Sequence, residues 1–267
     1  MQDIAQLTAR ARLDVLEIAT TSADTADAEV STNVLSQEAY AQAMILAYFL
    51  LFMIYMSLIM YGNMVATGVA EEKSSRIMEV MAATVKPMEL MTGKIIGIGS
   101  LGMLQFVIWI GTGLIMASMR NLGLPIGTVP VSTLLWFGVF FVLGFLFYAT
   151  LYAAGGAVVS RVEEVQQAVT ILMMGIIVGF FVAFTSFNNP NSTFANIASL
   201  IPFFSPMVMF ARIILSNPPI IQIILSIVFL IIGIVVGAWF AARIYRVGIL
   251  MYGKRPNVKE ILRYITG

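Results

Sequence analysis

Long stretches without a single Asp, Glu, Lys or Arg limit how this sequence can fold more than any other feature. They cover residues 39–70, 95–119, 121–160, 165–211 and 213–242. A helix that crosses a lipid bilayer needs about 20 mainly apolar residues, so each stretch can hold one. Only 11% of the 267 residues are charged, against about 25% in soluble domains. The sequence therefore predicts an all-α integral membrane protein.

Five hydrophobic segments are expected to be transmembrane helices. Their predicted bounds are 42–67, 95–118, 132–157, 168–187 and 220–243. Cytoplasmic loops of membrane proteins are enriched in Lys and Arg. With the N-terminus outside and the C-terminus cytoplasmic, eleven of the fifteen bases fall on the cytoplasmic side, so we expect this orientation. The bases left outside are Arg10, Arg12, Arg120 and Arg212.

The composition divides the chain into three parts. Residues 1–40 carry seven acids and two bases and lie outside in this orientation. Residues 41–248 hold the five spans, and residues 249–267 form a cytoplasmic tail. The tail bases are Lys254, Arg255, Lys259 and Arg263. They can meet either anionic lipid headgroups or a partner protein, and both interpretations stay open.

An amphipathic cytoplasmic helix is expected over residues 69–86, between the first two spans. Its apolar face is formed by Ile77, Val80, Met81 and Val85, at helical spacing. On the polar side, Glu72 stands four residues before Arg76, the order that stabilises a helix. Pro87 then suits the first position of a helix that re-enters the membrane. The amphipathic helix either presents its charged face to a soluble partner or only anchors the loop at the interface.

The segment before the last span is apolar but interrupted by proline. Its prolines are Pro190, Pro202, Pro206, Pro218 and Pro219. Because proline breaks helices, residues 194–215 cannot form a complete span. We expect a re-entrant or interfacial pair of short helices on the outer side. The alternative is an aromatic-rich loop at the headgroups.

Small and polar residues inside the spans suggest how the helices pack. Three glycine pairs have a spacing of four: Gly93 and Gly97, Gly175 and Gly179, Gly233 and Gly237. Such pairs allow helices to approach closely, within the bundle or in a second copy, although any single pair can arise by chance. The deepest polar candidates are Gln105, Tyr148, Thr150, Tyr152 and Thr185. Gln105 is expected to bond a neighbouring helix rather than contact cargo.

Several functional classes are excluded or disfavoured. The chain has no Cys and no His, which removes thiolate metal sites, most zinc sites and the usual Ser-His and Cys-His pairs. It also lacks the Gly-x-x-x-x-Gly-Lys-Ser/Thr phosphate loop. A net charge of +1 gives no reason to expect nucleic-acid binding. Because ion-coupled transporters usually place charged residues near mid-bilayer, the uncharged spans indicate an energy source outside this chain. We expect no catalytic residue, no metal site and no cofactor in this chain.

Three stretches resemble the permease subunits of type-two ATP-binding cassette exporters, especially their sodium-efflux-like branch. They are EEKSSRIMEVMAATVKPMELMTGKIIGIG, IPFFSPMVMFARI and AARIYRVGILMYGKRPNVKEILRY. The resemblance covers roughly residues 40–265. It implies a plasma (inner) membrane permease that works as a dimer with a separate ATPase subunit, which binds ATP and Mg. It also implies a further span before residue 1, with residues 1–40 as the remnant of an extracytoplasmic domain.

The resemblance also implies roles for two groups of residues. The ATPase-coupling surface would comprise Glu71, Glu72, Lys73, Ser74, Ser75, Arg76, Ile77 and Glu79. An outer gate would comprise Pro202, Phe203, Phe204, Ser205 and Pro206. The cargo, sodium or a small hydrophobic compound, cannot be read from the spans. The alternative function is a non-transporting membrane scaffold or sensor component.

Overall fold

The computed structural model describes residues 44, 45, 47–75, 87–120, 131–159 and 161–250. Two compact units, Met1–Ile45 and Leu46–Gly267, make up the chain, and the helices described below lie in the second. Within the described ranges the secondary structure is helical, with no strand. The chain is therefore an all-α protein, as its sequence predicts.

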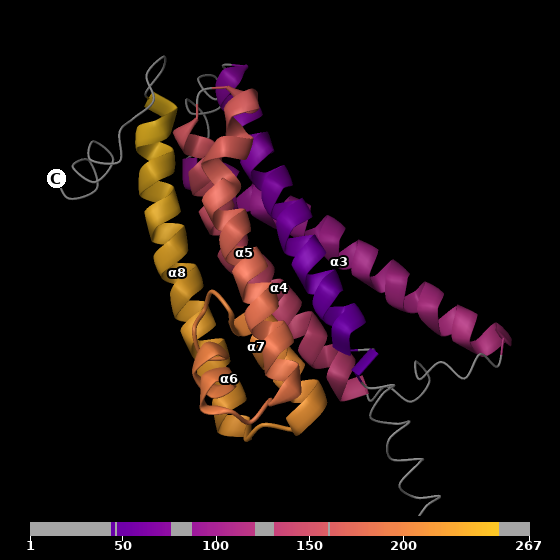
Figure 1. Ribbon diagram of the computed structural model, residues 1–267. Coiled ribbons are helices and arrows are strands. Elements are labelled where there is room, and N and C mark those ends of the chain that lie inside the picture. Colours follow the sequence, from indigo (N-terminus) through magenta and orange to yellow (C-terminus); the bar gives the residue numbers. More distant parts are fainter. Residues whose placement is uncertain (1–43, 46, 76–86, 121–130, 160, 251–267) are drawn as a thin grey trace, which may run out of the picture. The chain divides into compact units, whose positions relative to one another are not determined.

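Figure 1 shows the helices coloured along the sequence. In chain order they are a first helix, Ala47–Ser74, then α3 (Pro87–Arg120), α4 (Val131–Val158), η2 (Val162–Glu164), α5 (Val165–Asn188), α6 (Thr193–Ala198), α7 (Ser205–Ser216) and α8 (Ile220–Leu250). Five segments within these helices are long and apolar enough to cross a membrane, the fourth of them combining η2 with α5. They are Ala47–Ser74, Glu89–Thr112, Ser132–Val158, Val162–Asn188 and Ile220–Ile244. The prediction of five spans in a multi-pass membrane protein is confirmed.

Local sequence explains where several helices begin and end. Helix α3 starts at Pro87, as predicted, with Glu89 in its first turn, where an acid is favourable near the positive end of the helix dipole. Helix α6 is capped by Ser192, whose hydroxyl accepts a hydrogen bond from the Ala195 N–H. Helix α7 ends at Asn217, which adopts the left-handed conformation with φ 45°. The expected pair of short helices before the last span is thus present as α6 and α7.

Helix α4 forms the centre of the second unit. It packs against α3, α5, α7 and α8, and its buried face is aromatic. The buried aromatic residues of α4 are Phe137, Phe140, Phe141, Phe145, Phe147, Tyr148 and Tyr152. Conversely, α3, α5 and α8 expose large apolar side chains, with Ile171 80% and Val235 63% exposed. Such extended apolar faces suit lipid rather than water.

The connectivity places two regions at opposite ends of the helices. The first helix ends, α3 begins, α4 ends and α5 begins at one end, which we call the Ser74 end. At the other end, α5 leads into α6 and α7, and α8 begins (Figure 1). The sequence predicts functional residues at both ends.

Candidate functional site

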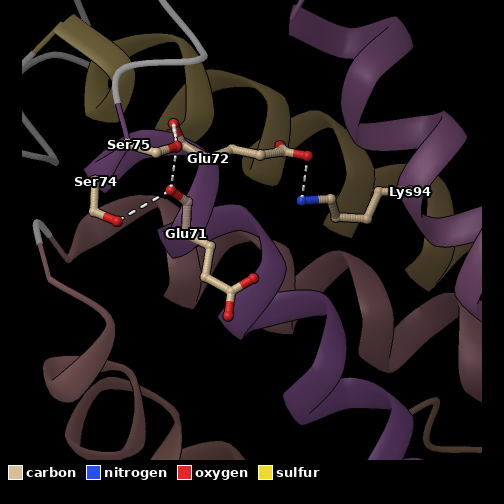
Figure 2. Close-up of polar contacts among 5 residues, drawn as sticks. All are labelled: Glu71, Glu72, Ser74, Ser75 and Lys94. Atoms are coloured by element: carbon tan, nitrogen blue, oxygen red, sulfur yellow. Dashed lines mark hydrogen bonds and ion pairs between the residues drawn. The ribbon is translucent and has the colours of Figure 1, made fainter.

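Polar residues from the last turn of the first helix and from α3 lie together at the Ser74 end. We define the first-helix cluster as Glu71, Glu72, Ser74, Ser75 and Lys94 (Figure 2). The helix reaches Ser74 without a break, so residues 69–74 do not begin a separate amphipathic helix. The remaining residues of the expected coupling helix, 76–86, lie outside the described residues, and with them Arg76, Ile77 and Glu79.

Two serines cap the end of the first helix. The Ser74 hydroxyl donates to the Glu71 carbonyl at 3.0 Å, and the Ser75 hydroxyl donates to the same oxygen at 2.8 Å. The same oxygen also accepts the Ser75 N–H at 2.9 Å, so the two hydroxyls add to a backbone bond in the last turn of the helix (Figure 2). Glu71, Ser74 and Ser75 are all exposed. The helix therefore presents a carboxylate and two hydroxyls to its surroundings.

Glu72 joins the first helix to α3. Its Oε1 lies 2.7 Å from Lys94 Nζ, as Figure 2 shows. The Lys94 side chain lies over Gly68, where an added Cβ atom would come within 3.0 Å of Nζ. The neighbour that sequence spacing suggested for Glu72, Arg76, lies outside the described residues; within them, Glu72 pairs with Lys94.

Lys73 turns away from this surface and into the bundle. Only 2% of the residue is exposed, and its Nζ donates a 2.9 Å hydrogen bond to the Ala157 carbonyl of α4. The resemblance groups Lys73 with an exposed coupling surface, but the structure places its ammonium inside. A buried ammonium is costly unless it is paired, so this position must be supported by its neighbours.

The residues of the expected outer gate pack tightly against three helices. The Phe203 ring fills the space beside Gly175 of α5, and Pro206 lies against Gly144 of α4. The Phe203 carbonyl accepts a 2.6 Å hydrogen bond from the Tyr148 hydroxyl. The segment is thus fixed through its backbone as well as its rings.

The other members of the segment are also held. Ser205 is fully buried and shares a hydrogen bond with Ser226 of α8. Pro202 lies beside Gly233 of α8, where its Cβ would be 3.0 Å from a Cβ added to the glycine. The Phe204 ring packs edge-on against Phe203. All five predicted gate residues therefore come together between α4, α5 and α8. Whether they gate a pathway stays a prediction.

Arg212 is a buried cation at this end, and sequence reasoning missed its role. It is 1% exposed, and its guanidinium donates four hydrogen bonds to neutral oxygens. The acceptors are the Pro190 carbonyl at 2.8 Å, Ser199 Oγ at 2.8 Å, Asn196 Oδ1, and Gln222 Oε1 at 2.8 Å. Burial lowers the pKa of the Arg212 guanidinium below its ordinary value, but arginine remains charged. Arg212 thereby joins the end of α5, α6, α7 and α8.

The three glycine pairs lie in different surroundings. Beside Gly175 and Gly179 lie Phe203 and Met207, and Gly237 meets the Thr150 hydroxyl of α4. Around Gly93 and Gly97, in contrast, no heavy atom of the other described helices lies within 4 Å of an added Cβ. Two pairs are therefore in contact within the chain, and the α3 pair faces open space.

Four of the five predicted polar residues inside the spans form hydrogen bonds within the protein. Gln105 accepts a hydrogen bond from the Tyr61 hydroxyl of the first helix, so the prediction that it bonds a neighbouring helix is confirmed. Thr150 donates to the Phe147 carbonyl at 2.7 Å, and Thr185 to the Val182 carbonyl at 2.9 Å. Tyr152 differs, since its buried hydroxyl has no hydrogen-bond partner among the residues that the structure describes.

Comparison with known proteins gives two curated relatives. The chain is 38% identical over 235 residues to the uncharacterized protein YhaP of Bacillus subtilis, covering 85% of this chain and 56% of the relative. It is 29% identical over 219 residues to the uncharacterized protein MJ1024 of Methanocaldococcus jannaschii, covering 80% and 52%. The chain thus spans about half the length of the curated relatives it matches. No solved structure matches it significantly.

A family model extends over most of the sequence. The model of the ABC-2 family transporter protein matches residues 1–243, which include nearly all of the five candidate spans. Together with the helical membrane fold, this match assigns the family. The chain belongs to the ABC-2 family of transporter proteins.

Proposed function

We propose that this chain is the membrane-spanning permease subunit of an ATP-driven exporter. In this proposal it moves substrate out of the cell together with a separate ATP-binding subunit, which holds ATP and Mg. The observation that carries the proposal is the family match over residues 1–243. The exposed first-helix cluster supports it, because Glu71, Ser74 and Ser75 offer a polar surface at the end of a spanning helix.

The two ends of the chain have separate tasks in this proposal. The Ser74 end faces the cytoplasm of a plasma membrane and, with residues 76–86, receives the ATP-binding subunit. The segment Pro202–Pro206 closes the outer side of the pathway. Two copies of the permease assemble with two ATP-binding subunits, and ATP binding shifts them between inward-open and outward-open states. The open face around Gly93 and Gly97 is available for helix packing with another chain.

The cargo belongs to the same proposal. The resemblance to the sodium-efflux-like branch suggests sodium, and a small hydrophobic compound is the second candidate. Efflux from vesicles that contain the chain and its ATP-binding subunit, measured with labelled sodium and with a fluorescent hydrophobic dye, distinguishes these two cargoes.

Co-purification tests the partnership. Glu71→Lys reverses a charge on the exposed cluster and should weaken retention of the ATP-binding subunit. Glu163→Lys is the matched control, since Glu163 is an exposed acid of η2 at the same end. Equal retention by the two variants would show that the cluster is not the coupling surface.

The alternative is a membrane scaffold or sensor component that transports nothing. It predicts that no ATP-binding subunit co-purifies with the unmodified chain and that deletion leaves efflux unchanged. A transporter is expected to retain the ATP-binding subunit and to lose efflux on deletion, whereas a scaffold is expected to do neither.

A further inference from the structure

We infer that Lys73 is a positioning residue that ties the end of the first helix to α4 and α5, so that displacement of this end is passed to both helices. The inference rests on the proposed function, because an ATP-binding subunit supplies the displacement. It assigns Lys73 a role inside the bundle rather than in the surface that touches the partner.

The first link is the hydrogen bond from Lys73 to α4. The acceptor, the Ala157 carbonyl, lies in the last turn of α4 (Val131–Val158). Carbonyls in a last helical turn lack N–H partners within the helix and carry partial negative charge. A lysine ammonium is therefore well matched to this position, and the bond fixes it to the end of α4.

The second link is electrostatic and involves α5. The charge of the Glu164 carboxylate favours the charged form of Lys73, while burial has the larger effect and opposes it. Glu164 closes η2 and is the N-cap residue of α5, where a negative charge is favoured by the helix dipole. The Lys73 ammonium thus bonds a carbonyl at the end of α4 and is attracted by the charge of an acid at the start of α5.

Neighbouring residues complete the connection. Glu72 bonds Lys94 of α3, while Lys73 bonds α4 and is attracted by the charge of Glu164 before α5. Successive residues of a helix point about 100° apart, since a turn holds 3.6 residues. Two consecutive charged residues can therefore reach three different helices from one turn.

A flexible lysine at a helix end normally extends its charged head toward water. Lys73 instead is almost completely buried, next to the exposed Ser74. Two turns earlier, the backbones of the first helix and α4 meet at Ala66 and Gly156. The contact at Ala66 fixes the crossing point of the helices, and Lys73 fixes the part of the first helix beyond it.

The test measures whether α5 moves when the ATP-binding subunit closes. The chain has no native Cys, so spin labels can be placed on Gln167→Cys at the start of α5 and Val235→Cys on α8, both exposed. Pulsed electron paramagnetic resonance on the complex, with and without ATP and vanadate, gives the distance between them. We expect a shift with Lys73 intact, loss of the shift in Lys73→Met and Glu164→Gln, and its recovery in Lys73→Arg.

Retention of the ATP-binding subunit and thermal stability are measured on the same samples. Arg161→Gln, which removes an exposed positive charge near η2, is the matched control and should keep the shift. A full shift in Lys73→Met, or no shift in the intact complex, overturns the inference while leaving the partnership in place. If no ATP-binding subunit is retained by the unmodified chain, the proposed function fails and the inference fails with it.

Discussion

Gly156 of α4 lies directly against the main chain of Ala66 in the first helix. A Cβ atom at position 156 would overlap the Ala66 carbonyl oxygen and come within 2.9 Å of its Cα. Both of these atoms are backbone, so no side-chain rotation can relieve the overlap. The approach of the two helices therefore depends on glycine at this position.

Gly156→Ala should destabilise the protein by about 2 kcal/mol, because an overpacked helix contact forces the backbone to shift. Gly97→Ala is the matched control, since no heavy atom of the other described helices lies within 4 Å of its added Cβ. Alanine in an open helical position is neutral or stabilising by up to about 1 kcal/mol. Thermal unfolding in detergent measures both variants. Equal melting temperatures for the two would contradict the close approach of the first helix to α4.

Arg212→Met should destabilise the end opposite Ser74 by about 3 kcal/mol, because it leaves several buried oxygens without their donor. Arg212→Lys should recover part of the loss, since an ammonium has three donors and four acceptors surround Arg212. Local hydrogen exchange of α6 and α7, compared with α4, locates the effect. Unchanged exchange in α6 and α7 would show that Arg212 does not hold these helices.

Glu72→Lys should lower stability by about 1 kcal/mol, the upper range for a partly exposed ion pair. The double variant Glu72→Lys/Lys94→Glu should recover most of this loss, because it restores the pair with the charges exchanged. A double-mutant cycle on melting temperatures at low and high salt isolates the interaction. Additive effects of the two single changes would mean that the 2.7 Å pair contributes nothing.

The sequence predicted the spans well because they follow from simple physical rules. Runs without charge set the five spanning segments, and Pro87 with Glu89 set the start of α3. The proline-interrupted segment before the last span also followed, since its prolines prevent a complete span and its apolar residues are buried against other helices. These features depend only on local composition.

The contacts of single charged residues could not be predicted in this way. In the sequence, Lys73 stands among polar residues, which suggests an exposed position. It is buried because the end of α4 and the start of α5 lie at the same end as the last turn of the first helix. The orientation rule counted Arg212 as one of the bases outside. Its isolation was a usable signal, because it is the one charged residue between Glu164 and Arg243, and an isolated charge in an apolar region usually has partners.

Ser74 offers the most direct test of the central claim, which is that the Ser74 end receives a cytoplasmic ATP-binding subunit. Ser74→Cys is treated with a membrane-impermeant maleimide in sealed right-side-out vesicles, with exposed Thr193→Cys at the opposite end as the matched control. We expect labelling of Thr193→Cys in sealed vesicles, labelling of Ser74→Cys only after the vesicles are opened, and protection of Ser74→Cys by the bound ATP-binding subunit. Labelling of Ser74→Cys in sealed vesicles would place this end outside and contradict the account.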